Sequence, residues 1–192
     1  MIAFDETTHT YTDSGVVLPS VTHICRFYQV DTIANAKPWL RDIAADRGSR
    51  VHAYTVCLDY GETLEGIDPD CIGYVKAYQR FLSDYRPNWT HVEHIMGSKD
   101  AGYAGTADRM GQIDGINCIL DIKTTSKLHK VAVKAQLQGY AELAQRDGFI
   151  AYRLLALLLD KGGTYRIYDF DFGDEFKTAL KMEKYLKGAS SK

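Results

Sequence analysis

Long apolar runs are missing from this sequence. The most apolar segment, residues 154–159, is far shorter than the roughly 18 residues that a membrane-spanning helix needs, and its pattern is typical of a buried strand. The N-terminus also lacks the basic start and the apolar stretch of a secretory signal. We therefore expect no membrane segment and a cytoplasmic location.

Cysteine is scarce and scattered. Cys25, Cys57, Cys71 and Cys118 are the four cysteines of the chain, and no two of them form a C-x-x-C pair. This spacing argues against a zinc knuckle. Scattered cysteines in a chain without a leader are typical of buried thiols in a reducing compartment, so we expect no disulfide.

An excess of positive charge is also absent. The chain holds 23 Lys and Arg against 25 Asp and Glu, a net charge of −2. This balance argues against a protein that coats nucleic acid non-specifically, but it allows a basic groove beside an acidic site. One basic segment contains Lys123, Lys127, His129, Lys130 and Lys134. It is either a solvated surface or a strip that contacts phosphates.

The residues that are present suit one domain over 1–192. Apolar residues make up 45% of the chain and charged residues 25%, which is usual for a globular protein. Apolar periodicity and turn residues predict a hairpin at 9–18, helices at 21–28, 39–59 and 71–85, strands at 89–97, 103–113 and 117–123, a helix at 131–146, strands at 150–159 and 165–171, and a helix at 174–186.

This order of elements predicts an α+β fold, with a mixed central sheet flanked by helices. Residues 1–88 are expected to be mainly helical apart from the hairpin. The sheet core and its helix occupy 89–172, and a last helix spans 174–187. The long helix at 39–59 is expected to turn one apolar face to the core: Trp39, Leu40, Ile43, Val51, Tyr54 and Leu58.

Three local signals refine this fold. Ser20 is a good N-cap for the helix that follows it. Asp114-Gly115 is a strong two-residue hairpin turn between the second and third predicted strands. Gly48 lies inside a helix, where glycine costs about 1 kcal/mol against alanine, so we expect a close backbone approach there.

Asp121 and Lys123 lie two positions apart on a predicted strand, so their side chains share one face about 7 Å apart. Ile122 between them points the other way, into the core. A carboxylate beside an ammonium is either a catalytic pair or a structural ion pair. The three residues alone do not decide between these readings.

Asp108 lies on the strand that the Asp114-Gly115 turn pairs with the strand of Asp121. Two carboxylates on one face repel each other unless a cation lies between them. Oxygen ligands of this kind suit Mg²⁺ or Mn²⁺. The alternative is a pair of solvated aspartates on an exposed face of the sheet.

These residues are part of a longer ordered set, which reads Gly105-x-x-Asp108, Asp121-x-Lys123 and Gln136-x-x-x-Tyr140. The set resembles the PD-(D/E)XK nucleases of the RecB-like group. The resemblance implies a restriction-endonuclease-like core and a metal-dependent nuclease.

Upstream residues extend the resemblance, which covers about residues 9–142. Gly48-x-x-x-His52 matches the histidine motif of the group, and Glu93 stands where many members carry a further acidic residue. The segment Leu-Pro-Ser-Val-Thr at 18–22 resembles a narrower branch. That branch contains mitochondrial genome maintenance exonuclease and related phage-type nucleases.

The resemblance implies a metal site. Asp108 and Asp121 would be the main ligands of Mg²⁺ or Mn²⁺, and the backbone carbonyl of Ile122 often completes the site in the family. His52 would be a further ligand through its imidazole, which favours Mn²⁺ more than an all-oxygen site does. Glu93 is either another ligand or an exposed strand carboxylate.

The resemblance also implies roles at the substrate. Lys123 would orient or help to deprotonate the attacking water, and Gln136 would contact substrate phosphate or Lys123. Tyr140 is either a substrate contact or a core residue. Candidate contacts to the DNA backbone are Ser20 (alternatively only a helix cap), Thr22, Lys127, Lys130 and Lys134.

The expected activity is hydrolysis of DNA, as an exonuclease that prefers single-stranded ends in phage-type replication, recombination or repair. Some family members hold an iron–sulfur cluster with four cysteines, three of them near the C-terminus. This chain has no cysteine after Cys118, so we expect no such cluster. The alternatives are a structure-specific endonuclease and a non-catalytic nucleic-acid-binding module on the same fold.

Overall fold

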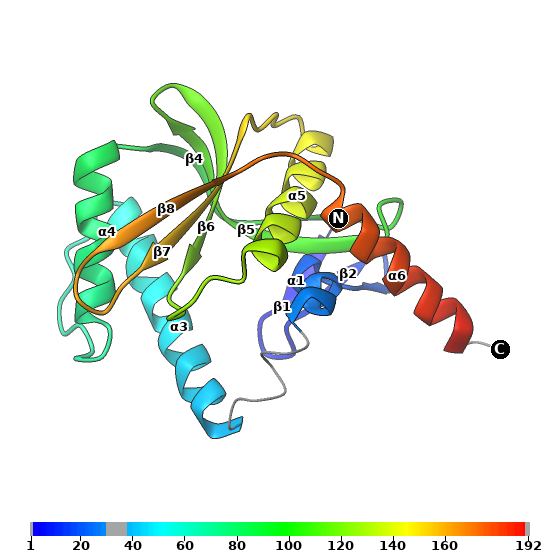
Figure 1. Ribbon diagram of the computed structural model, residues 1–192, viewed down its shortest axis with the longest axis horizontal. Coiled ribbons are helices and arrows are strands. Elements are labelled where there is room, and N and C mark those ends of the chain that lie inside the picture. Colours follow the sequence, from blue (N-terminus) through cyan, green and yellow to red (C-terminus); the bar gives the residue numbers. More distant parts are fainter. Residues whose placement is uncertain (1, 30–37, 191–192) are drawn as a thin grey trace.

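A computed structural model describes residues 2–29 and 38–190 of the chain. Its centre is a five-stranded sheet in the order β4-β5-β6-β7-β8 (Figure 1). The strands span β4 (Asn88–Ser98), β5 (Tyr103–Ile113), β6 (Ile116–Lys123), β7 (Arg153–Leu159) and β8 (Tyr165–Phe170). Only β6 and β7 run parallel; every other neighbouring pair is antiparallel. The predicted mixed sheet is confirmed.

Helices cover both faces of this sheet (Figure 1). α3 (Pro38–Asp59) and α4 (Ile72–Tyr85) cover one face, with a core that includes Val51, Phe81 and Leu120. On the other face, α1 (Val21–Cys25) and α5 (Lys130–Arg146) pack on the strands, and α6 (Glu175–Ser190) packs against both helices. A 3₁₀ turn, η1 (Arg26–Gln29), follows α1. The predicted α+β class is confirmed.

The strand β6 alternates between these two cores. Ile119 belongs to the core under α1 and α5, whereas Leu120 and Ile122 belong to the core under α3 and α4. Because side chains alternate along a strand, Asp121 lies on the α5 side. The predicted inward direction of Ile122 is confirmed.

A second, three-stranded antiparallel sheet precedes the helices: β1 (Ile2–Asp5), β2 (Thr10–Asp13) and β3 (Val16–Leu18). The hairpin of β2 and β3 was expected, and β1 was not. This sheet is tied to β5, because Ala104 donates its N–H to the Pro19 carbonyl and pairs with Ser20 in an isolated parallel bridge. Tyr11 and Thr106 share a hydrogen bond of 2.8 Å between their hydroxyls.

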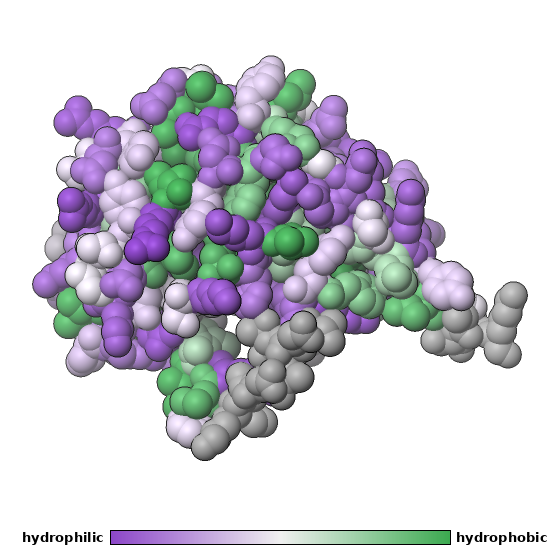
Figure 2. All heavy atoms as spheres, in the orientation of Figure 1, coloured by the Kyte–Doolittle hydropathy of each residue, from purple (hydrophilic) through white to green (hydrophobic). Residues whose placement is uncertain are grey.

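The prediction that the first turns of α3 face the core is wrong. Trp39, Leu40 and Ile43 are 57%, 47% and 53% exposed, while Val51 further along the helix is fully buried. The N-terminal half of α3 projects beyond the sheet (Figure 1), and apolar side chains gather at its free end (Figure 2). The predicted strand start at residue 150 is also wrong, since β7 begins at Arg153.

All four cysteines are free, as expected. Among residues 2–29 and 38–190, no helix combines the length and the apolarity that are required to cross a membrane.

The prediction of a close backbone approach at Gly48 is wrong; close approaches occur at other glycines, and Gly105 is one of them. A Cβ on Gly48 would meet only Thr124 Oγ1, at an ordinary 3.4 Å. A Cβ on Gly105 would lie 2.8 Å from Tyr140 Cε1 and 3.1 Å from Val21 Cγ2. Gly105 therefore lets α1 and α5 pack directly on β5.

Gly105→Ala is expected to lower the free energy of unfolding by about 1–3 kcal/mol, because the added methyl group overpacks this contact. Urea denaturation measures the change. The matched control is Gly188→Ala, where an added Cβ meets nothing within 4 Å. Gly188 lies inside α6, so helix propensity alone should make its variant more stable. A Gly105→Ala variant at least as stable as wild type would contradict the packing argument.

Candidate active site

One cavity of about 400 Å³ collects most of the residues that the sequence singles out. It is bounded by the N-terminal sheet, α3, α5 and the strands β4, β5 and β6. We call it the main cavity. Its lining includes Phe4, His9, Tyr11, Thr22, Gly48, His52, Glu93, Thr106, Asp108, Asp121, Lys123, Gln136 and Tyr140.

Three of these side chains form a compact cluster of metal-ligand type. One ligand atom each of His52, Glu93 and Asp108 lies within 4.8 Å of the other two. His52 Nδ1 is 3.6 Å from Glu93 Oε1 and 3.8 Å from Asp108 Oδ1. We call these residues the carboxylate–histidine cluster. Asp121 is not a member of it.

The main chain of Ile122 contacts two members of this cluster. Its N–H donates to Asp108 Oδ2 at 2.6 Å, and its carbonyl lies 3.1 Å from His52 Nε2. The ring therefore donates Nε2–H to this carbonyl and turns Nδ1 toward the two carboxylates. The main chain of β6 thus orients both His52, which lies on α3, and Asp108, which lies on β5.

Glu93 reaches the cluster through an irregularity in β4. Val92 pairs with Arg109 and His94 pairs with Ala107, so Glu93 lies opposite Asp108 between these two pairs. Its φ is 50°, in the left-handed region that glutamate rarely adopts. A second irregularity between Trp89 and His91 shifts the register.

The charges around His52 make the cluster suited to a cation. Burial opposes protonation of the imidazole, but the carboxylates of Asp108 and Glu93 raise the pKa of His52 to about 9. Conversely, although burial opposes ionisation of Glu93, the neighbouring His52 and Arg109 lower its pKa overall. A proton on Nδ1 thus balances the carboxylates, and a divalent ion replaces such a proton when it binds. The donor set of two carboxylates and an imidazole fits Mn²⁺ or Mg²⁺.

Lys123 lies beside the cluster with two partners. Its Nζ is 2.8 Å from Asp121 Oδ2 and donates to Gln136 Oε1 at 3.1 Å. Gln136 Nε2 in turn lies 3.2 Å from Thr22 Oγ1 and 2.8 Å from the Tyr140 hydroxyl. The predicted contact between Gln136 and Lys123 is present. A chain of hydrogen bonds therefore holds the ammonium in the main cavity.

Asp121 is almost completely buried, with 1% exposure. Burial raises its pKa to about 6, against the opposing effect of the Lys123 ammonium. The ion pair with Lys123 that the sequence left open is therefore present. It does not exclude a ligand role for Asp121, because its carboxylate lines the same cavity as Asp108.

Arg109 is a residue that sequence reasoning missed. Its side chain is fully buried behind the cluster and donates to Glu93 Oε1 at 3.0 Å, to Asp59 Oδ2 at 2.5 Å and to Thr55 Oγ1 at 2.8 Å. It therefore links Glu93 to the end of α3. The sequence shows that Arg109 directly follows Asp108. Its burial, however, depends on Asp59, which is distant in the sequence.

The remaining candidates are more dispersed. Ser20 caps α1, since its hydroxyl accepts the His23 N–H at 3.0 Å. None of the three loop and helix lysines, Lys127, Lys130 and Lys134, lines the main cavity. Lys134 is held by Asp171 at 3.1 Å and by Glu175 at 2.7 Å.

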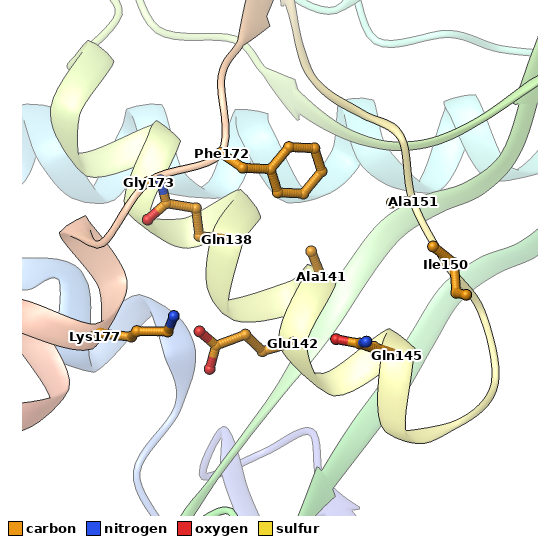
Figure 3. A pocket seen from close by; sticks show the side chains of 9 residues that line it. All are labelled: Gln138, Ala141, Glu142, Gln145, Ile150, Ala151, Phe172, Gly173 and Lys177. Atoms are coloured by element: carbon orange, nitrogen blue, oxygen red, sulfur yellow. The ribbon is translucent and has the colours of Figure 1, made fainter.

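A second cavity of about 230 Å³ lies on another side of α5 (Figure 3). Its lining includes Glu142, Lys177 and Phe172, and it contains none of the predicted site residues. Glu142 is its only carboxylate, and that group accepts a hydrogen bond from the Tyr103 hydroxyl at 3.1 Å. The chemistry-bearing side chains are therefore concentrated in the main cavity.

No family model matches the sequence, and no curated protein matches it. Solved structures that are similar in fold include two exonucleases. One is a provisional exonuclease from Eubacterium rectale, with 16% identity over 72% of this chain and 62% of that chain, and a TM-score of 0.45. This chain thus spans less than two-thirds of it.

The other solved structure is an alkaline exonuclease from Laribacter hongkongensis. Its identity is 14% over 88% of this chain and 92% of that chain, with a TM-score of 0.40. Both likenesses are distant, so a function for the chain has to rest on the residues of the main cavity.

Proposed function

We propose that this chain is a divalent-metal-dependent DNA nuclease with a PD-(D/E)XK core of the RecB-like type. The observation that carries the proposal is the convergence of two units in one cavity. The first is the carboxylate–histidine cluster of His52, Glu93 and Asp108. The second is Lys123, held between Asp121 and Gln136.

Phosphodiester hydrolysis requires an activated water, a polarised phosphoryl group and a stabilised leaving oxygen, and a bound Mg²⁺ or Mn²⁺ supplies this chemistry. His52, Glu93 and Asp108 would hold the ion, with Asp121 as the further oxygen expected from the sequence. The Ile122 carbonyl, also expected as a ligand, instead accepts the Nε2–H of His52 on the far side of the ring. Lys123 orients or helps to deprotonate the attacking water and offsets negative charge at phosphorus. Gln136 positions the ammonium.

The substrate we propose is DNA with single-stranded ends, cleaved as an exonuclease in phage-type replication, recombination or repair. A structure-specific endonuclease is the second candidate, because the same cavity serves either mode. Circular single-stranded DNA separates the two: an exonuclease leaves it intact, whereas an endonuclease converts it to linear fragments.

The decisive experiment incubates end-labelled single-stranded and double-stranded DNA with the protein and Mg²⁺ or Mn²⁺. Lys123→Ala is expected to remove cleavage, and Lys161→Ala, on an exposed turn outside the main cavity, is the matched control. Binding of DNA without cleavage above the Lys123→Ala background would contradict the proposal. The chain would then be a nucleic-acid-binding module.

The imidazole predicts a metal preference. His52→Ala is expected to weaken Mn²⁺ binding by at least tenfold and to reduce activity in Mn²⁺ more than in Mg²⁺, because nitrogen ligands favour Mn²⁺ more than oxygen ligands do. Calorimetric titration with each ion measures the affinities, and His94→Ala, which lies outside the main cavity, is the control. An unchanged ratio of the two affinities would remove His52 from the ligand set.

A further inference from the structure

Three aromatic rings of the N-terminal sheet form one side of the main cavity. Phe4 stacks on Tyr11 with ring centroids 4.5 Å apart and an angle of 29°. His9 meets Phe4 edge-on at 5.1 Å and Tyr11 at 6.3 Å. All three line the main cavity, and we call them the aromatic wall. The phosphodiester chemistry proposed above uses none of them.

The aromatic wall lies close to the carboxylate–histidine cluster. Tyr11 bonds Thr106 through its hydroxyl at 2.8 Å, and Thr106 stands two residues before Asp108 on β5. Residues at that spacing share a strand face and lie about 7 Å apart. Burial raises the pKa of Tyr11, and the negative charges of Glu93 and Asp108 raise it further. The cavity thus has an ionic end and an aromatic end within the reach of one nucleotide.

We infer that the aromatic wall stacks an unpaired nucleobase of the nucleotide next to the scissile phosphodiester. This inference rests on the proposed nuclease function and names the part of its substrate that decides specificity. Stacking on aromatic side chains accepts any base, because every base has a π-face. A base inside a duplex has both faces covered by its neighbours, so the wall selects single-stranded ends over blunt duplex.

The competing role of the aromatic wall is packing alone. Phe4 is partly buried and packs against the small core of Tyr11, Leu18 and Ala104. His9, however, is exposed and extends the wall outside that core. Its φ of 53° is a conformation that histidine adopts infrequently. A core role does not require an aromatic ring at that position, whereas a stacking surface uses it.

Two substitutions remove rings with little damage to the fold. Phe4→Leu keeps an apolar side chain against Tyr11 but removes the flat face. His9→Asn removes the imidazole, and asparagine tolerates the positive φ at this turn. Tyr152→Leu is the matched control, since Tyr152 is 66% exposed and does not line the main cavity. Thermal unfolding checks that each variant is folded.

The probe is a single-stranded oligonucleotide with 2-aminopurine at its terminal position, whose fluorescence falls when the base stacks on an aromatic ring. Binding is measured with Ca²⁺ in place of Mg²⁺, so that a complex is observed without cleavage. We expect wild-type protein and Tyr152→Leu to quench the fluorescence. Phe4→Leu and His9→Asn are each expected to lose most of the quench and to bind single strands roughly tenfold more weakly. Blunt duplex binding is expected to stay within twofold of wild type.

Two results would overturn the inference. The first is a full quench in both folded variants. The second is an equal loss of affinity for blunt duplex and single strands. If either occurs while wild-type protein still cleaves labelled DNA in Mg²⁺, the wall has only a packing role and the proposed nuclease function stands. Conversely, a wall-dependent quench without any Lys123-dependent cleavage supports the stacking site and contradicts the nuclease function.

Discussion

Asp108→Asn is expected to lower the rate of DNA cleavage roughly 1,000-fold, because it removes an anionic ligand from the centre of the proposed metal site. Asp108 holds this place with both oxygens: Oδ1 faces His52 Nδ1 at 3.8 Å, and Oδ2 accepts the Ile122 N–H at 2.6 Å. An asparagine amide oxygen still accepts that N–H. The substitution should therefore remove charge while it leaves the fold intact.

The matched control for this prediction is Asp114→Asn. Asp114 lies on the same β5–β6 hairpin, in its turn, with a φ of 53° that asparagine tolerates. Cleavage of end-labelled single-stranded DNA in Mg²⁺ and Mn²⁺ is the measurement, and calorimetry gives the metal affinity of each variant. Cleavage by Asp108→Asn at a tenth of the wild-type rate or more would mean that this carboxylate is not a required ligand.

The central residues of the site could be predicted from the sequence, because their positions depend on regular secondary structure. A two-residue turn and the alternation of strand side chains bring Asp108, Asp121 and Lys123 to one region, since both rules act between near neighbours in the chain. In the structure, all three side chains line the main cavity. The helix that follows β6 adds Gln136 through the usual crossover between parallel strands.

The positions of Glu93 and Arg109 in the site could not be predicted from the sequence. Glu93 faces His52 only because β4 departs from regular pairing, with a positive φ at a residue type that gives no signal of it. Arg109 alternates with Asp108 and reads as an ordinary strand arginine. Its burial requires a carboxylate from α3, and no local pattern identifies a partner that is so far away in the sequence.

The long helix α3 shows a second limit. Its apolar residues predict a buried stripe, and Val51 is indeed buried. Periodicity gives the direction of that stripe but not the length of the neighbouring sheet, so the exposure of Trp39 and Ile43 was not foreseeable. The aromatic wall was not foreseeable either. Its Phe4 lies on β1, and no hairpin signal in the sequence marks that strand.

Arg109→Met is expected to lower the free energy of unfolding by about 3–5 kcal/mol, because it leaves a buried carboxylate without its cation. The side chains of Arg109 and Asp59 are 0% and 2% exposed, so water cannot replace the lost partner. The Tyr78 hydroxyl also donates to Asp59, at 2.9 Å, but it carries no charge that could balance the carboxylate. Urea denaturation of the protein without metal measures the effect.

A double variant separates the ion pair from simple packing. Arg109→Met with Asp59→Asn removes both charges, and it is expected to recover a large part of the stability that Arg109→Met alone loses. If the losses of the two single variants simply add, the pair is not coupled and Arg109 is only a space-filling residue. Coupling would instead show that the buried ion pair stabilises the fold. Arg109 is in addition a positioning residue for Glu93 if its loss weakens metal binding by a protein that is still folded. In that case Mn²⁺ affinity should stay reduced in the stable double variant, since Glu93 has lost the guanidinium that lies 3.0 Å from its Oε1.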